Sequence, residues 1–160
     1  MKQVTATLAM VFLGDKILLG KRKKKIGFDD GFYNGFGGRL EEGETVEEAT
    51  LRELTEESGV VGTEYEKVGV IEFDVWFKGE HTWMTVHIYK ITKFEGEPIE
   101  TDEASPEWFD LDKIPYDKMF PDDIYWLPLV LEGKKVKGVF TLAKDLSVLE
   151  HKVDIVENLP

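Results

Sequence analysis

The sequence of 160 residues contains no cysteine, which excludes disulfide bonds, thiolate metal sites and cysteine nucleophiles. It also has no apolar run of the 18 residues or more that a membrane-spanning helix needs, and no charged and then apolar leader typical of a signal peptide. No Pro/Gly/Ser-rich linker divides the chain. We therefore expect one domain over residues 1–160, cytoplasmic, monomeric and without a membrane partner.

Positive charge is scarce as well, because 20 Lys and Arg residues face 32 Asp and Glu residues and leave a net charge of −12. Stable nucleic-acid binding needs clustered positive charge, so we do not expect it. An anionic substrate must arrive with bound metal or at a local basic patch. Arg39 and residues 21–25, all Lys or Arg, offer such a patch. An exposed strand end or a targeting signal explains the basic run equally well.

The most informative stretch is residues 38–60, which read GRLEEGETVEEATLRELTEESGV. Thr45 and Glu48 have the spacing of a capping box, in which each side chain satisfies a free backbone N–H at a helix start. Gly59 can adopt the left-handed conformation that closes a helix. These two signals predict a helix over residues 46–58.

The glutamates of this helix are not placed as solvated glutamates would be. At about 100° per residue, Glu53, Glu56 and Glu57 project into or beside the apolar arc that should pack inward. Crowded, partly desolvated carboxylates repel one another, and a divalent cation would remove the conflict. Oxygen ligands without cysteine or a nearby histidine select Mg²⁺, with Mn²⁺ also possible.

The same stretch resembles the signature of the Nudix hydrolase family, G-x5-E-x7-R-E-U-x-E-E-x-G-U, where U is aliphatic. Every fixed position is matched, by Gly38, Glu44, Arg52, Glu53, Leu54, Glu56, Glu57, Gly59 and Val60. The resemblance implies an α/β (α+β) sandwich with a mixed β-sheet packed between helices, and a Mg²⁺-dependent attack of water on a polyphosphate. It makes Glu53, Glu56 and Glu57 catalytic and metal-binding, with the Gly37 carbonyl and Glu103 as further ligands. Arg52, eight residues after Glu44, is expected to pair with acidic neighbours and brace the loop before the helix.

A wider resemblance, over about residues 4–142, is to the oxidised-purine nucleoside triphosphatases of this family. It rests on FYNGFGGRLEEGET and on WFDLDKIPYDKMFPDDIYWLPLVLEGKKVKGVF. It implies hydrolysis of a small-molecule nucleoside triphosphate such as 8-oxo-dGTP or 2-hydroxy-dATP to the monophosphate and pyrophosphate, which sanitises the nucleotide pool. Asn34, Asp122 and Asp123 match base-reading residues. The positions that match the rest of the substrate pocket are Thr7, Arg22, Phe28, Phe73, Met84, Phe120 and Trp126.

Other interpretations stay open at this point. Asp122 and Asp123 also suit the start of a second helix running toward Leu131, as capping and dipole partners, and sequence alone favours that reading. The altered pocket positions, among them Arg22 for a lysine and Phe120 for a tryptophan, leave room for another substrate such as ADP-ribose or a dinucleoside polyphosphate. A non-catalytic RNA-binding module is a further alternative.

The remaining chain predicts strands and gives little chemistry. Alternating or β-prone residues, bounded by turn residues, indicate strands over residues 5–13, 16–21, 67–77, 83–91, 108–111, 138–142 and 148–156. We expect the last two to be edge strands without a role in the site. His87 is expected to be a satisfied core or edge histidine, and Pro128 to interrupt or kink the second helix.

Overall fold

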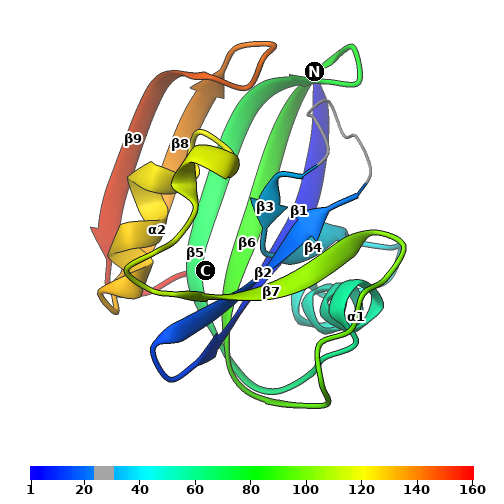
Figure 1. Cartoon of the computed structure of the whole chain (residues 1–160). Helices are drawn as coiled ribbons and strands as arrows, with labels where there is room; N and C mark the ends of the chain where they lie inside the picture. The colour runs from blue at the N-terminus through cyan, green and yellow to red at the C-terminus, as the bar shows by residue number, and fades with distance from the viewer. Residues whose placement is uncertain (24–30) are drawn as a thin grey trace.

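The computed structural model describes residues 1–23 and 31–160. The predicted pocket residue Phe28, and Lys24 and Lys25 of the basic run, lie outside these ranges. Within them, nine strands form one sheet that is accompanied by two α-helices and a short 3-10 helix (Figure 1). Neither α-helix of the described ranges has the length and apolar character that crossing a bilayer requires.

The strands are β1 (Lys2–Leu13), β2 (Lys16–Arg22), β3 (Tyr33–Asn34), β4 (Phe36–Arg39), β5 (Val61–Phe77), β6 (Glu80–Glu95), β7 (Ala104–Asp110), β8 (Lys135–Leu142) and β9 (Val148–Val156). The helices are α1 (Val46–Ser58), η1 (Tyr116–Lys118) and α2 (Asp123–Leu131).

The sheet is built around β1, whose two edges are used differently. One edge pairs in parallel with β6 along almost the whole strand. The other edge is divided, because the middle of β1 pairs with β4 and the end of β1 with β2, both antiparallel. Beyond β6 the order continues through β5, β8 and β9, and β5 is antiparallel to β6 but parallel to β8. The sheet is therefore mixed, as expected.

Two apolar clusters lie on opposite faces of the sheet. Trp126 and Leu127 of α2 belong to one cluster, and Leu54 of α1 belongs to the other. Figure 1 shows the two helices on different sides of the curved sheet. Residues of β1 are buried on both faces, since Met10 joins the first cluster and Val11 the second. This burial explains why the sequence of β1 alternates only loosely, and the α+β sandwich is confirmed.

One prediction about the C-terminal third is wrong, since β8 is not an edge strand but pairs with β5 on one side and with β9 on the other. Pro128 does not interrupt the second helix, which continues to Leu131; the alternative of a kink at this residue stays a prediction. The strands of the long hairpin are also longer than predicted: β5 and β6 extend to a two-residue turn at Lys78 and Gly79, both with positive φ, as a tight hairpin turn requires.

Candidate active site

Helix α1 begins and ends where the sequence predicts. The backbone N–H of Glu48 donates to the Thr45 hydroxyl at 3.1 Å, and the N–H of Thr45 donates to the Glu48 carboxylate at 2.9 Å. Gly59 closes the helix with φ of 77°. The capping box is thus complete, and it fixes the register in which the glutamates of α1 leave the helix.

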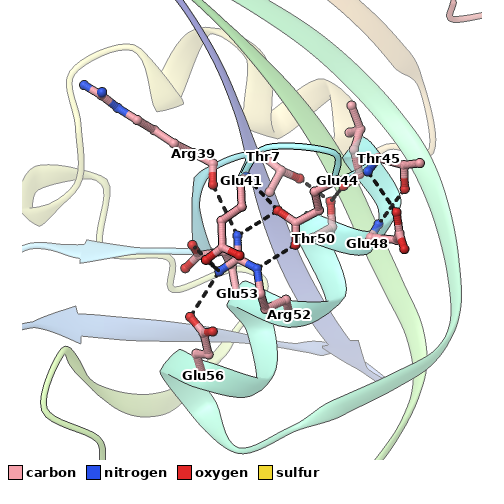
Figure 2. Close-up of polar contacts among 11 residues, drawn as sticks. Thr7, Arg39, Glu41, Glu44, Thr45, Glu48, Thr50, Arg52, Glu53 and Glu56 are labelled. Atoms are coloured by element: carbon pink, nitrogen blue, oxygen red, sulfur yellow. Dashed lines mark hydrogen bonds and ion pairs between the residues drawn. The ribbon is translucent and has the colours of Figure 1, made fainter.

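Arg52 holds the loop before α1 in place, as Figure 2 shows. Its Nε and Nη2 atoms donate to the two carboxylate oxygens of Glu44 at 2.6 and 2.9 Å, and Nη2 also donates to the carbonyl of Arg39 at 3.3 Å. The hydrogen bonds from Arg52 are the main reason why the pKa of Glu44 falls to about 2. Such a two-pronged pair fixes geometry as well as charge, so the predicted bracing role of Arg52 is confirmed.

Three carboxylates converge beside this loop. Glu53, Glu57 and Glu103 each bring one oxygen within 4.8 Å of the other two. Glu57 is only 1% exposed, and it accepts from the N–H of Gly37 at 2.8 Å and from Arg22 Nη1 at 3.2 Å. Burial, followed by the hydrogen bond with Glu103, raises the pKa of Glu57 to about 8, although Arg22 opposes the rise. Burial also raises the pKa of Glu53.

This acidic cluster fits a hard divalent cation. Its donors are all carboxylate oxygens, the ligand type of Mg²⁺, Mn²⁺ and Ca²⁺. Burial raises the pKa of Glu53 and Glu57 although Arg52 and Arg22 pair with them, so a bound cation would further stabilise their ionised forms.

Gly38 keeps the space beside Glu53 free, because a Cβ there would lie 2.7 Å from Glu53 Oε1. Gly37 allows β4 to lie close to β1, because a Cβ there would lie 1.9 Å from the Thr7 carbonyl oxygen.

Glu56 does not join the acidic cluster. Its side chain is 56% exposed, and Oε2 accepts from Arg52 Nη1 at 3.2 Å. One step along a helix turns the side-chain direction by about 100°, so Glu56 and Glu57 point to different sides of α1. The charge of Glu56 still contributes to the raised pKa of Glu53. The sequence predicted that Glu53, Glu56 and Glu57 crowd together. In the structure the crowded carboxylates are Glu53, Glu57 and Glu103.

A cavity of about 290 Å³ lies next to the acidic cluster and is bordered by Gly37 and Gly38. Strands β1, β4, β5 and β6, the start of α2 and the turn between β8 and β9 contribute to its wall. Nine of the ten predicted pocket residues line it, namely Thr7, Arg22, Asn34, Phe73, Met84, Phe120, Asp122, Asp123 and Trp126. The tenth, Phe28, lies outside the described ranges.

The aspartate pair is buried at the wall of this cavity. Asp122 is 6% exposed and Asp123 3%. Trp126 Nε1 donates to Asp122 Oδ2 at 2.9 Å, whereas Asp123 Oδ2 has no hydrogen-bond partner in the part of the chain that the structure describes. Burial raises the pKa of both groups, and that of Asp123 rises further because Asp122 lies beside it. The capping interpretation is wrong, since the Asp122 side chain makes no capping hydrogen bond.

Thr7 and Asn34 contribute to the cavity in different ways. The Thr7 hydroxyl is hydrogen-bonded to the hydroxyl of Thr50 on α1 and donates to the His87 carbonyl at 3.2 Å. Its hydrogen is therefore used within the protein and is not available to a ligand in the cavity. Asn34 Oδ1 accepts from the N–H of Gly35 at 2.9 Å. This bond orients the Asn34 side chain with its NH₂ group as the remaining donor.

The sequence pattern of the NUDIX domain family matches residues 1–130 of this chain. The chain belongs to the Nudix family. It is 46% identical over 153 residues to the oxidized purine nucleoside triphosphate hydrolase of Danio rerio, with 96% of each chain covered, and 41% identical over 152 residues to the protein of the same name from Mus musculus, with 95% of each covered.

The Nudix fold is also found by comparison with solved structures. A MutT protein from Bacillus halodurans superimposes with a TM-score of 0.83 at 25% sequence identity, and the match covers 94% of this chain and 97% of the other. This coverage exceeds the segment of residues 1–130 that matches the family pattern, so the likeness extends into the C-terminal part of the chain.

Several residues of this Nudix site were not predicted from the sequence, namely Phe77, Leu142 and Leu146, which all line the cavity. Arg39, which the sequence offered as part of a basic patch, lines the cavity too, and its guanidinium lies 5.4 Å from the centre of the Phe77 ring. No local pattern marks the two leucines.

The expectation for His87 is wrong in part. The residue lies in β6 as predicted, but its Nδ1 atom is buried without a hydrogen-bond partner among residues 1–23 and 31–160. Burial, with the charge of Lys67, lowers the pKa of His87, and the neutral ring tolerates the missing partner better than a charged one would.

Proposed function

We propose that this Nudix chain hydrolyses oxidised purine nucleoside triphosphates, such as 8-oxo-dGTP and 2-hydroxy-dATP, to the monophosphate and pyrophosphate. The observation that carries the proposal is the buried Asp122–Asp123 pair at the wall of a cavity that reaches the acidic cluster at Gly37 and Gly38. A purine on the aspartates would place its phosphates toward the carboxylates. The names of the two relatives from Danio rerio and Mus musculus support the same substrate class.

The aspartate pair suits a purine whose hydrogen-bonding edge varies. Asp122 accepts from Trp126, which stabilises its ionised form, while the pKa of Asp123 is raised furthest and favours its neutral, donating form. An acceptor next to a donor, with the NH₂ group of Asn34 nearby, recognises both oxidised guanine and oxidised adenine. A base that leaves these buried groups unpaired would be rejected.

We further propose that the resident ion is Mg²⁺, which Mn²⁺ can replace. Glu53, Glu57 and Glu103 would hold it, with the Gly37 carbonyl and Glu56 as additional ligands. A bound divalent cation neutralises polyphosphate charge and polarises the attacked phosphorus. Glu56, exposed at the edge of the acidic cluster, would orient the attacking water and accept its proton.

Two arginines would bind the phosphates. Arg22 already pairs with Glu57, whereas Arg39 makes no ion pair among the described residues and stacks on Phe77 at the cavity wall. In Figure 2 the Arg39 side chain points away from the glutamates around Arg52. We propose that Arg39 supplies local positive charge in a chain of net charge −12, where a polyphosphate would otherwise be repelled.

We propose that the enzyme acts as a monomer on small-molecule nucleotides and takes no stable nucleic-acid partner, which the net charge of −12 supports. Nucleoside triphosphates are made and used inside cells, and we therefore propose a cytoplasmic location for the enzyme.

The test is steady-state turnover with Mg²⁺ on 8-oxo-dGTP, 2-hydroxy-dATP, dGTP, dATP and ADP-ribose, with identification of the products. We expect a higher kcat/KM on the oxidised triphosphates and release of monophosphate and pyrophosphate. Equal kcat/KM for dGTP and 8-oxo-dGTP would contradict the proposal, and cleavage of ADP-ribose alone would replace it.

A further inference from the structure

Leu146, in the turn between β8 and β9, has an unusual backbone conformation. Its φ is 68°, and in the described ranges only one other non-glycine residue, Lys78, has a positive φ. The left-handed region is unfavourable for a side chain as bulky as leucine. Such strain persists where the surrounding structure requires it, and it is concentrated at functional sites.

The turn does not itself call for leucine. The N–H of Leu146 donates to the Ala143 carbonyl at 2.8 Å, and the N–H of Ala143 donates to the Ser147 carbonyl at 2.9 Å. The Asp145 carboxylate accepts from the N–H and hydroxyl of Ser147 at 3.0 and 2.6 Å. These bonds hold the backbone in the left-handed conformation, for which glycine or asparagine would be less strained.

Lys78 provides the contrast. It is exposed and lies with Gly79 in the two-residue turn between β5 and β6, where both residues have positive φ. A turn of this kind requires positive φ at both central positions. The conformation of Lys78 is therefore explained by its turn alone, whereas the leucine side chain at position 146 needs another reason.

The side chain of Leu146 supplies that reason, because it lines the cavity. The parallel pairing of Asp74 with Thr141 sets Val75 of β5 beside Leu142 of β8, and both of these residues line the same cavity. Leu146 is partly buried and packs against the apolar cluster that contains Val75 and Leu142. It thus adds a third element to the apolar side of a cavity whose polar side carries the aspartates.

We propose that Leu146 is a specificity-determining residue that narrows the cavity against the purine and holds the base on the Asp122–Asp123 pair. The inference rests on the proposed function, because it takes the occupant to be a purine nucleotide. Apolar side chains opposite a few fixed polar groups are the usual composition of a small-molecule site. In this proposal the leucine side chain contacts the base, and this contact offsets the backbone strain at position 146.

The test compares Leu146→Gly with Lys78→Gly. Both replace a residue of positive φ by glycine, but only the first removes a side chain from the cavity. For Leu146→Gly we expect the KM for 8-oxo-dGTP to rise roughly tenfold with little change in kcat, as for a lost apolar contact to the substrate. The ratio of kcat/KM for 8-oxo-dGTP over dCTP should fall, because a pyrimidine is too small to reach the leucine.

Lys78→Gly should leave all of these constants unchanged. A second variant, Leu146→Ala, keeps a side chain at the strained position and should give a smaller rise in KM. The midpoint of thermal unfolding, measured for each variant, identifies a general loss of structure.

An unchanged KM in Leu146→Gly would overturn the proposal, and so would a loss of activity that is equal for 8-oxo-dGTP and dCTP. The proposed function is judged separately, by turnover of the wild-type chain. If the wild type turned over none of the nucleotides, calorimetric binding of 8-oxo-dGMP to wild type and Leu146→Gly would decide: weaker binding by the variant supports the role of Leu146, and equal or absent binding overturns it.

Discussion

Glu56 and Glu57 are adjacent in the chain and have opposite surroundings. Glu57 is buried and bonded to Gly37 and Arg22, and its pKa is raised to about 8. Glu56 is exposed and bonded only to Arg52 among the described residues. A buried carboxylate in a fixed position suits ion binding, and an exposed one at the same edge suits contact with water. The two glutamates are thus expected to differ in role.

Replacing Glu56 by Gln should therefore remove turnover without unfolding the protein. We expect kcat to fall by roughly 10²- to 10⁴-fold, the contribution of a positioned general base, because Gln cannot accept the proton of water. Steady-state kinetics on 8-oxo-dGTP measures the loss, and circular dichroism checks the fold. The exposed Glu66→Gln is the matched control. Retention of activity in Glu56→Gln would exclude Glu56 as the base.

Asp123 should make the stability of the protein depend on pH. Its pKa is raised well above 3.8 in the folded state by burial and by Asp122, so the folded state binds this proton more tightly than the unfolded state. The resulting stability is complete below about pH 4 and is lost as the pH rises through the folded pKa. Asp123→Asn removes the titrating group.

Relative to the wild type, Asp123→Asn should therefore gain stability between pH 5 and pH 8, by on the order of 1 kcal/mol or more. Urea unfolding at the two pH values measures the difference. Asp112→Asn, at an exposed position, serves as the control and should show no comparable gain. An equal effect of Asp123→Asn at pH 5 and pH 8 would contradict a raised pKa.

Among single residues, the sequence predicted those whose partners are near in the chain. Arg52 with Glu44, and Gly38 with the helix that follows it, lie within one loop and one helix. The direction of Glu56 was not foreseen, because helical geometry places it beside the apolar arc while only the packed structure shows it to be exposed. The capping interpretation of Asp122 failed although the partner is near in the chain, because Trp126, four residues further along in α2, donates to the Asp122 carboxylate where both side chains are buried.

At the scale of elements, α1 is the most important, since it carries Glu53 and Glu57 and the start of α1 is fixed by the capping box. Thr45→Ala should lower the free energy of unfolding by about 1 kcal/mol, because one backbone N–H loses its partner. Chemical denaturation measures this loss. Thr45→Ser keeps the hydroxyl and should remain close to the wild type; an equal loss in both variants would show that the hydroxyl is not what stabilises the helix.

The ends of α1 could be predicted to the residue because capping chemistry is local. The order in which strands pair could not be predicted, because paired strands can be far apart in the chain. Residues 138–142 read as an edge strand, yet β8 pairs with β5 across a separation of more than 60 residues in the chain. The same pairing brings Leu142 and Leu146 to the cavity. Sequence spacing could not predict that these two leucines line it.

At the scale of the whole molecule, the acidic cluster joins α1 to Glu103, which precedes β7. An ion bound there should stabilise the fold by mass action, by about 2.7 kcal/mol when its concentration is 100 times its dissociation constant. We expect Mg²⁺ to raise the midpoint of thermal unfolding, and chelation to reverse the rise.

Glu57→Gln should remove this response to Mg²⁺, since it takes away the most buried ligand of the cluster. Without metal the variant should be no less stable than the wild type, because it removes a carboxyl group whose ionisation burial opposes. KCl at matched ionic strength controls for screening. A full Mg²⁺ shift in Glu57→Gln would remove that residue from the ion site.

The parallel pairing of β1 with β6 has a consequence during translation. Lys2 pairs with Thr82 and Val11 with Ile91, and ribosomes add about 5–20 residues per second. The first strand therefore leaves the ribosome roughly 4 to 16 s before its neighbour has been synthesised. In that interval its only strand partners among the described residues are β2 and β4, and both pair along its other edge. The nascent chain thus presents an apolar strand with one open edge for seconds, which makes this edge the natural target for chaperones.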